Sequence, residues 1–130
     1  MRRAASAVLC LVFAFAGYAA ADVPVMSFDA GPAGRLDLAP DGIAAADLSD
    51  GDTSAILTFR LAPDPAAALG DLTGRAIGRS VAILLCGTEI VAPVIHARID
   101  GGTGRLTLPD AATATAYVAA LRGDAPCPAD

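Results

Sequence analysis

The chain has 130 residues, a formal net charge of −5, nine arginines and no lysine. This length suits one small domain, near the size at which a single hydrophobic core becomes adequate. An acidic, lysine-free chain argues against binding of nucleic acid or of anionic lipid, because both need a basic patch.

Residues 1–21 have the three parts of a secretory signal: two arginines, an apolar run from Val8 to Ala16, and small residues before Asp22. The apolar run is shorter than the about 20 residues of a membrane span, which disfavours an uncleaved anchor. We therefore expect cleavage near Ala21 and a periplasmic or secreted protein. No other stretch approaches the length of a transmembrane helix, so we expect no transmembrane segment after cleavage.

Residues 22–53 form the first part of the expected mature chain. The segments "PVMSFD" and "GRLDLA" each predict a short strand, separated by the turn-forming "AGPAG". The dipeptide Asp50-Gly51 is a hairpin signal, so Ile43–Leu48 and Ser54–Leu61 are predicted to pair antiparallel.

A helix is predicted after this hairpin, with Asp64 as its N-cap, Pro65 at its first position and its end near Gly78. Its buried face, at helical spacing, is formed by Leu69, Leu72 and Ala76. Gly70 and Gly74 weaken the helix, so it depends on packing against the sheet.

An apolar hairpin follows. Val81–Leu85 reads as a central strand, Cys86-Gly87 as its turn, and Glu89–Ile99 as the returning strand. Pro93 has no N–H for a ladder hydrogen bond, so the returning strand is expected at a sheet edge or bulged there.

The chain is expected to close with the turn "DGGTG", the short strand "RLTL" and a second helix. Asp110 is predicted to cap this helix, and Gly123 to follow its last residue, Arg122. The apolar face of the helix consists of Ala114, Tyr117, Val118 and Leu121. This order predicts an α+β fold: a mostly antiparallel sheet with two helices on one face, related to ferredoxin-like arrangements.

Two cysteines, Cys86 and Cys127, remain after the expected cleavage. In an oxidising compartment such a pair is most simply a disulfide, which would close a loop of about 40 residues and contribute about 4 kcal/mol in the chain-entropy model. Two free thiols and a redox pair are the alternatives, although redox pairs usually have C-x-x-C spacing.

The sequence offers little chemistry. His96 is the sole histidine and has no identifiable nucleophile or metal-ligand partner, so a histidine at the sheet surface is favoured over a catalytic one. The spacing of Asp47, Asp50 and Asp52 does not fit a calcium loop. We therefore predict no catalytic residues, no metal and no cofactor.

The segment 72–123 resembles the head subdomain of the first periplasmic domain of the preprotein translocase subunit SecD and of its fused form SecDF. The similarity rests on Leu72-Thr73, Ile77-Gly78, Leu85, "IVAPVI" at 90–95, Gly101-Gly102 and Leu121-Arg122. The segment "IVAPVI" in a hairpin followed by two glycines is the most specific part.

The chain departs from the family pattern at several positions. Cys86 stands where the family has a turn aspartate, Ala76 where it has asparagine, and His96 where arginine is common; Pro109-Asp110 replaces a Phe-Thr pair. We also expect none of the membrane helices of SecD in the mature chain, and therefore no path for protons. The resemblance implies a head that contacts emerging polypeptide without coupling to an ion gradient.

These observations lead to two main hypotheses, beside the simpler alternative of a stand-alone structural domain recruited to an envelope complex. The first is an exported, non-enzymatic protein- or peptide-binding module, linked to protein export or envelope assembly, whose partner-binding strand contains Val91, Pro93, Val94, Ile95 and His96. Its partner would be a polypeptide or an envelope protein. The second is a small periplasmic enzyme or ligand-binding domain with a site around His96, Glu89 and Arg98. The expected organisation is a signal peptide at 1–21, N-terminal strands at 22–53, the head-like domain at 54–123 and a tail at 124–130.

Overall fold

The computed structural model describes residues 23–50 and 54–128. The predicted signal segment 1–21 and the turn residues Gly51 and Asp52 lie outside this range. In chain order the elements are β1 (Met26–Asp29), η2 (Gly31–Ala33), β2 (Arg35–Leu38), η3 (Pro40–Gly42), β3 (Ile43–Asp50), β4 (Ala55–Leu61), α2 (Pro63–Arg75), β5 (Ala82–Leu85), β6 (Thr88–Val91), β7 (Thr103–Leu108) and α3 (Ala111–Arg122).

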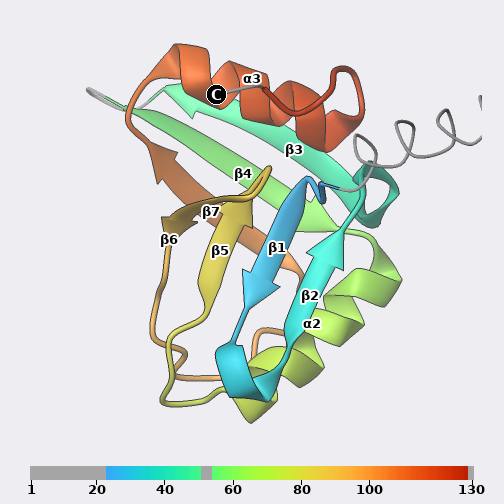
Figure 1. The fold of residues 1–130 in the computed structure, drawn as a ribbon, viewed down its shortest axis with the longest axis vertical. Helices are drawn as coiled ribbons and strands as arrows, with labels where there is room; N and C mark the ends of the chain where they lie inside the picture. The colour runs from blue at the N-terminus through green and yellow to red at the C-terminus, as the bar shows by residue number, and fades with distance from the viewer. Residues whose placement is uncertain (1–22, 51–53, 129–130) are drawn as a thin grey trace, which may run out of the picture.

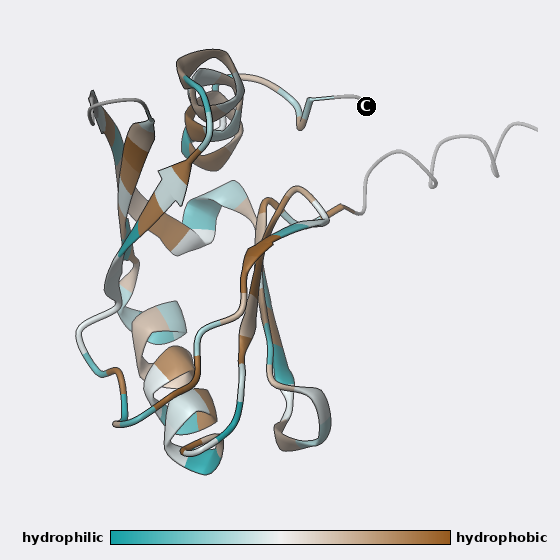
Figure 2. Cartoon of the chain, turned by 90° about the vertical axis from the view of Figure 1, so that its left-hand side faces the viewer, coloured by the Kyte–Doolittle hydropathy of each residue, from teal (hydrophilic) through white to brown (hydrophobic). Residues whose placement is uncertain are grey.

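The strands form two antiparallel sheets (Figure 1). Sheet A has the order β2-β1-β5-β6, and sheet B has the order β3-β4-β7. Figure 2 shows the two sheets on opposite sides of the molecule, with α3 toward one end and α2 toward the other. The expected α+β class is confirmed, but the strands are divided between two sheets instead of sharing one.

The N-terminal strands complete sheet A. β1 lies between β2 and β5, so that Phe28 is paired with Leu36 on one side and with Ile83 on the other. The predicted pairing of the next two strands is also confirmed, with Leu48 opposite Leu57 in β3 and β4. β5 is an interior strand, as its continuous apolar sequence predicts.

The two helices begin in different ways. Pro63, not Pro65, occupies the first position of α2, and Ala62 takes the N-cap position without a side-chain hydrogen bond, so the predicted Asp64 cap is wrong by two residues. A proline is tolerated there because the first N–H groups of a helix have no partner inside it. α3 begins as predicted, since the Asp110 carboxylate accepts a hydrogen bond of 2.7 Å from the Thr113 N–H.

The hydrophobic core joins the two sheets and the helices. Phe28 of sheet A and Phe59 of sheet B have ring centroids 6.2 Å apart and are both buried. The predicted helix faces also lie in this core, including Leu69 and Leu72 of α2 and Leu121 of α3. The apolar residues that alternate along β4 therefore pack toward sheet A, and the residues between them form an outer face.

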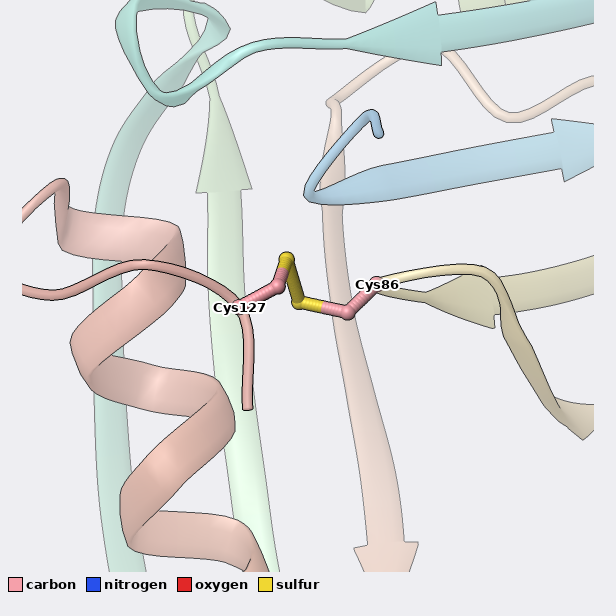
Figure 3. The surroundings of a disulfide bond; sticks show 2 residues. All are labelled: Cys86 and Cys127. Carbon is pink, nitrogen blue, oxygen red and sulfur yellow. A yellow bond between two sulfur atoms is a disulfide. The ribbon is translucent and has the colours of Figure 1, made fainter. Parts of the chain in front are cut away.

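A disulfide joins Cys86 and Cys127, with their Cα atoms 5.6 Å apart (Figure 3). Cys86 lies in the turn between β5 and β6, where φ is positive at both Cys86 (50°) and Gly87 (84°). This conformation is that of a two-residue hairpin turn whose twist matches the adjoining strands. Cys127 follows α3, so the disulfide links the β5–β6 hairpin to the C-terminal segment.

Candidate functional site

One edge of sheet A is formed by β6, which pairs only with β5 among the described strands. The strand is shorter than the predicted 89–99 segment and ends at Val91. Leu84 pairs with Glu89 but Ile83 pairs with Val91, so Ile90 is an extra residue that forms a bulge. A bulge interrupts regular pairing and bends its strand, which explains why the ladder ends early.

The edge nevertheless continues beyond β6 through residues 92–96. The Val81 N–H donates a hydrogen bond of 3.0 Å to the Pro93 carbonyl, and the Ile95 N–H donates one of 2.9 Å to the Arg79 carbonyl. Between these bonds lies an antiparallel bridge of Ser80 and Val94. In this geometry the backbone groups of the bridged residues point away from each other. The Val94 N–H and carbonyl therefore face outward, along the open edge.

The same pattern explains why Pro93 does not block this edge. The carbonyl of Pro93 points inward, toward Val81, so the N–H that a proline lacks would also have pointed inward. Proline protects an edge when it removes an outward N–H. Here the outward N–H of Val94 is retained, and the missing N–H of Pro93 removes a donor only from the internal ladder.

Apolar side chains are exposed along the same segment. Val91 is 42% exposed and Val94 is 48% exposed, whereas Ile95 is only 5% exposed and belongs to the core. Ile77, which bridges to Ile95, is 54% exposed. We call Ile77, Val91 and Val94 the apolar edge patch. Of the five residues of the predicted binding strand, Val91, Pro93, Val94 and His96 are therefore exposed, and Ile95 anchors the strand to the core.

Sequence reasoning did not assign Ile77 to the candidate site. It lies two residues after the end of α2, where an apolar residue ordinarily continues the buried face of the helix. The helix instead ends at Arg75, and the positive φ of Gly78 (85°) turns the chain toward β5. In the sequence, only Gly78, shortly after the helix, indicates this turn.

The other sheet edges carry charged or polar side chains. On β2, Arg35 forms ion pairs with Asp37 (2.8 Å) and Asp29 (3.1 Å). The hydroxyl of Ser27, together with Arg35, lowers the pKa of Asp37. The edge of sheet B formed by β7 presents Arg105 between two threonines. Charged edge residues discourage strand pairing, and the segment from Ile90 to Ile95 contains none.

The edge segment is held at its far end by contacts with α2. Arg98 donates hydrogen bonds to Asp71 of α2 (3.0 Å) and to Asp100, which together raise the pKa of the guanidinium. The backbone N–H of Ile99 donates to the buried hydroxyl of Thr73 at 2.9 Å. Arg98 crosses α2 close to Gly70, where a Cβ atom would lie 3.1 Å from Arg98 Nη2 and 2.9 Å from Asp100 Oδ1, which is the packing reason for this glycine. These contacts fix the position of the edge relative to the helix.

The structure does not bring together the side chains of the alternative site, which consists of His96, Glu89 and Arg98. Arg98 is engaged by Asp71 and Asp100 on the side of α2, and Glu89 lies in β6 as the partner of Leu84. All three side chains of the alternative site are exposed. Among the side chains described within 23–49 and 54–128, no three of His, Cys, Asp or Glu gather in a way that could hold a metal ion.

The comparisons with known proteins agree with this geometry. The family model of the SecDF P1 head subdomain matches residues 41–125, which include the edge segment and both helices. The chain belongs to this family. The predicted resemblance to the SecD head is therefore confirmed.

None of the helices in the described part of the chain is long and apolar enough to span a membrane.

Individual relatives are longer proteins. The chain is 37% identical over 67 residues to the protein translocase subunit SecD of Acidaminococcus fermentans, a match that covers 47% of this chain and 16% of that protein. A solved structure of SecDF, described as a membrane component that enhances protein export, has a TM-score of 0.60 and 25% identity over 75% of this chain and 44% of that one. SecDF in its super-membrane-facing form, with a TM-score of 0.55 and 22% identity, covers 75% of this chain and 13% of that one and shares the fold.

Proposed function

We propose that this protein is an exported, non-enzymatic binding module that holds an extended polypeptide segment along the edge formed by β6 and residues 92–96. The observation that carries the proposal is the outward N–H and carbonyl of Val94, which lie in the uncharged segment from Ile90 to Ile95 beside exposed apolar side chains. An extended chain can add to such an edge through backbone hydrogen bonds.

The chemistry of the edge favours an unfolded, β-prone partner. Backbone pairing is independent of partner sequence, so it supplies affinity for many polypeptides. The apolar edge patch of Ile77, Val91 and Val94 adds a preference for partners with apolar residues at alternate positions. Full burial of one apolar side chain of the partner contributes about 1.5–3 kcal/mol, which is enough to favour apolar segments over polar ones.

The relatives supply the cellular context of the proposal. The SecD relative is a translocase subunit, and the SecDF relative is a membrane component that enhances protein export. A head that receives a polypeptide during export would meet it in an extended state. This context, together with the predicted signal at 1–21, supports a periplasmic location and a role in export or envelope assembly.

A substitution at Val94 tests the proposed mode of binding. Val94→Pro removes the outward N–H and leaves the internal bonds of Pro93 and Ile95 in place, whereas Val94→Thr keeps the N–H and the branched shape. The probe is a fluorescent, soluble peptide of alternating valine and threonine, and its anisotropy reports binding. We expect binding by the wild type and the Thr variant and at least about tenfold weaker binding by the Pro variant, equivalent to one lost hydrogen bond and its steric cost.

The outcome is decided by binding and thermal unfolding together. A Pro variant that melts like the wild type and binds the probe equally well would overturn strand addition at this edge.

A photoreactive residue at position 91 provides an independent measurement in cells. It should crosslink to polypeptides in the periplasmic fraction, and the absence of any polypeptide product would contradict the proposal.

A further inference from the structure

The outer face of sheet B, on the far side of the sheet from the core, carries side chains aligned in rows across the strands. The strand register places Asp47, Thr58 and Arg105 in one row across β3, β4 and β7. Ala45, Arg60 and Thr103 form the next row. These residues alternate with the buried Leu57, Phe59 and Leu106, so their side chains point toward solvent.

Arg60 and Arg105 are diagonal neighbours on this face. Arg60 is directly opposite Thr103, and Arg105 is two residues further along the same strand. Such neighbours have Cα atoms about 7–8 Å apart, within the reach of two arginine side chains toward one point. Two exposed positive charges at this spacing repel each other weakly, and an anion between them would be attracted by both.

Most other arginines in the described residues have an acidic or carbonyl partner. Arg35 contacts Asp29 and Asp37, Arg98 contacts Asp71 and Asp100, Arg122 contacts Asp47, and Arg75 donates to the Ala33 carbonyl. Arg60 and Arg105 form no ion pair with any side chain that the structure describes within 23–49 and 54–128.

The acidic group nearest in register is already engaged. Asp47 lies in the same row as Arg105, separated from it by Thr58. Its carboxylate is bound by the guanidinium of Arg122, at 3.1 Å. Arg122 also donates a hydrogen bond of 2.8 Å to the carbonyl of Ala46, which holds it at the β3 side of the sheet. The positive charge of the arginine pair is therefore left facing solvent.

We propose that Arg60 and Arg105 form a binding site for a phosphate group on the outer face of sheet B. Two guanidinium groups approaching from neighbouring strands offer paired N–H donors, which match the several oxygens and the double negative charge of a phosphate monoester better than a single carboxylate. The site is on the other sheet from the polypeptide edge and is independent of it.

Titration by two-dimensional NMR of the amide and arginine side-chain signals tests this site. Inorganic phosphate is added through the millimolar range to the wild type, to Arg60→Gln, to Arg105→Gln and to the double variant. Arg79→Gln is the matched control, because Arg79 is an exposed arginine outside the outer face of sheet B. We expect saturable shifts centred on residues 58–60 and 103–105, at least about tenfold weaker binding in each single variant and none in the double variant.

A second arm identifies the source of the phosphate. Vesicles containing phosphatidic acid are compared with vesicles of phosphatidylcholine alone, using sedimentation of the bound protein. Binding of inorganic phosphate without vesicle binding assigns a soluble phosphate ligand, whereas binding of both that requires both arginines assigns a lipid headgroup. Binding of neither, or equal binding by the wild type and the double variant, would overturn the proposal.

Discussion

Gly104 of β7 lies directly opposite Phe59 of β4, and the Phe59 ring occupies the space that a side chain at position 104 would need. A Cβ atom at Gly104 would be 2.5 Å from the Cζ atom of this ring. The ring cannot move freely, because it is buried and packs against Phe28 of sheet A. The contact between the two sheets therefore depends on the absence of a side chain in β7.

The first prediction follows from this contact. Gly104→Ala should destabilise the protein by about 1–3 kcal/mol, since an added methyl group in a packed core forces side chains or backbone to shift. Gly101→Ala is the control, because a Cβ atom there meets nothing within 4 Å, and it should change stability by no more than about 0.5 kcal/mol. Denaturant unfolding of both variants measures the difference. Equal stabilities would show that the Phe59 ring is not confined.

The second prediction concerns the disulfide between Cys86 and Cys127. Replacing both cysteines by serine should lower the free energy of unfolding by about 2–4 kcal/mol, because the open chain gains conformational freedom when unfolded. Cys86→Asn with Cys127→Ser should recover part of this loss, since asparagine tolerates the positive φ of 50° better than serine. Unfolding curves of the three proteins test this order, and mass spectrometry with and without reductant verifies the bond in the wild type.

Local signals allowed much of the fold to be predicted. The Asp110 cap, the glycine after α3, the turn at Cys86-Gly87 and the two N-terminal strands are all present, because each depends on a few neighbouring residues. The start of α2 was misplaced because two prolines, Pro63 and Pro65, offer equivalent first positions. The pairing of β1 with β5 and the division into two sheets depend on contacts between distant segments, which no local pattern contains.

The candidate edge was predictable only in outline. Pro93 correctly predicted a strand at the sheet edge, and residues 90–95 carry the most specific part of the resemblance to the SecD head. Whether Val94 faces outward and Ile95 inward depends on the extra residue at Ile90, because one added residue reverses the faces of every residue after it. A bulge of this kind leaves no recognisable mark in the sequence. The outward position of Val94 and the inward position of Ile95 are therefore established only by the backbone hydrogen bonds of the structure.

The third prediction concerns Gly70 in α2. A Cβ atom there would lie 2.9 Å from Asp100 Oδ1 and 3.1 Å from Arg98 Nη2. Gly70→Ala should thus change stability little in the wild type, because the helix gains about 1 kcal/mol from alanine while the Arg98 and Asp100 contacts are displaced. In a background with Arg98→Ala and Asp100→Ala, the same change should stabilise the protein by about 1 kcal/mol. Thermal unfolding of the four proteins forms a double-mutant cycle, and additive effects would contradict the proposed packing of Arg98 on this glycine.

The last prediction is the pH dependence of the Asp110 cap. The hydrogen bond from the Thr113 N–H lowers the pKa of Asp110 below its ordinary value, so the charged carboxylate is favoured in the folded state. A lowered pKa contributes stability above the unfolded value of about 3.9, and this contribution is lost as the pH falls through the folded value. The wild type should therefore melt above Asp110→Ala at neutral pH, with a difference that shrinks below about pH 4. Asp110→Ser caps without charge, and its advantage over alanine should not depend on pH. Melting temperatures of the three proteins from about pH 7 to about pH 2 measure both differences, and a constant gap between the wild type and the alanine variant would refute the role of the charge.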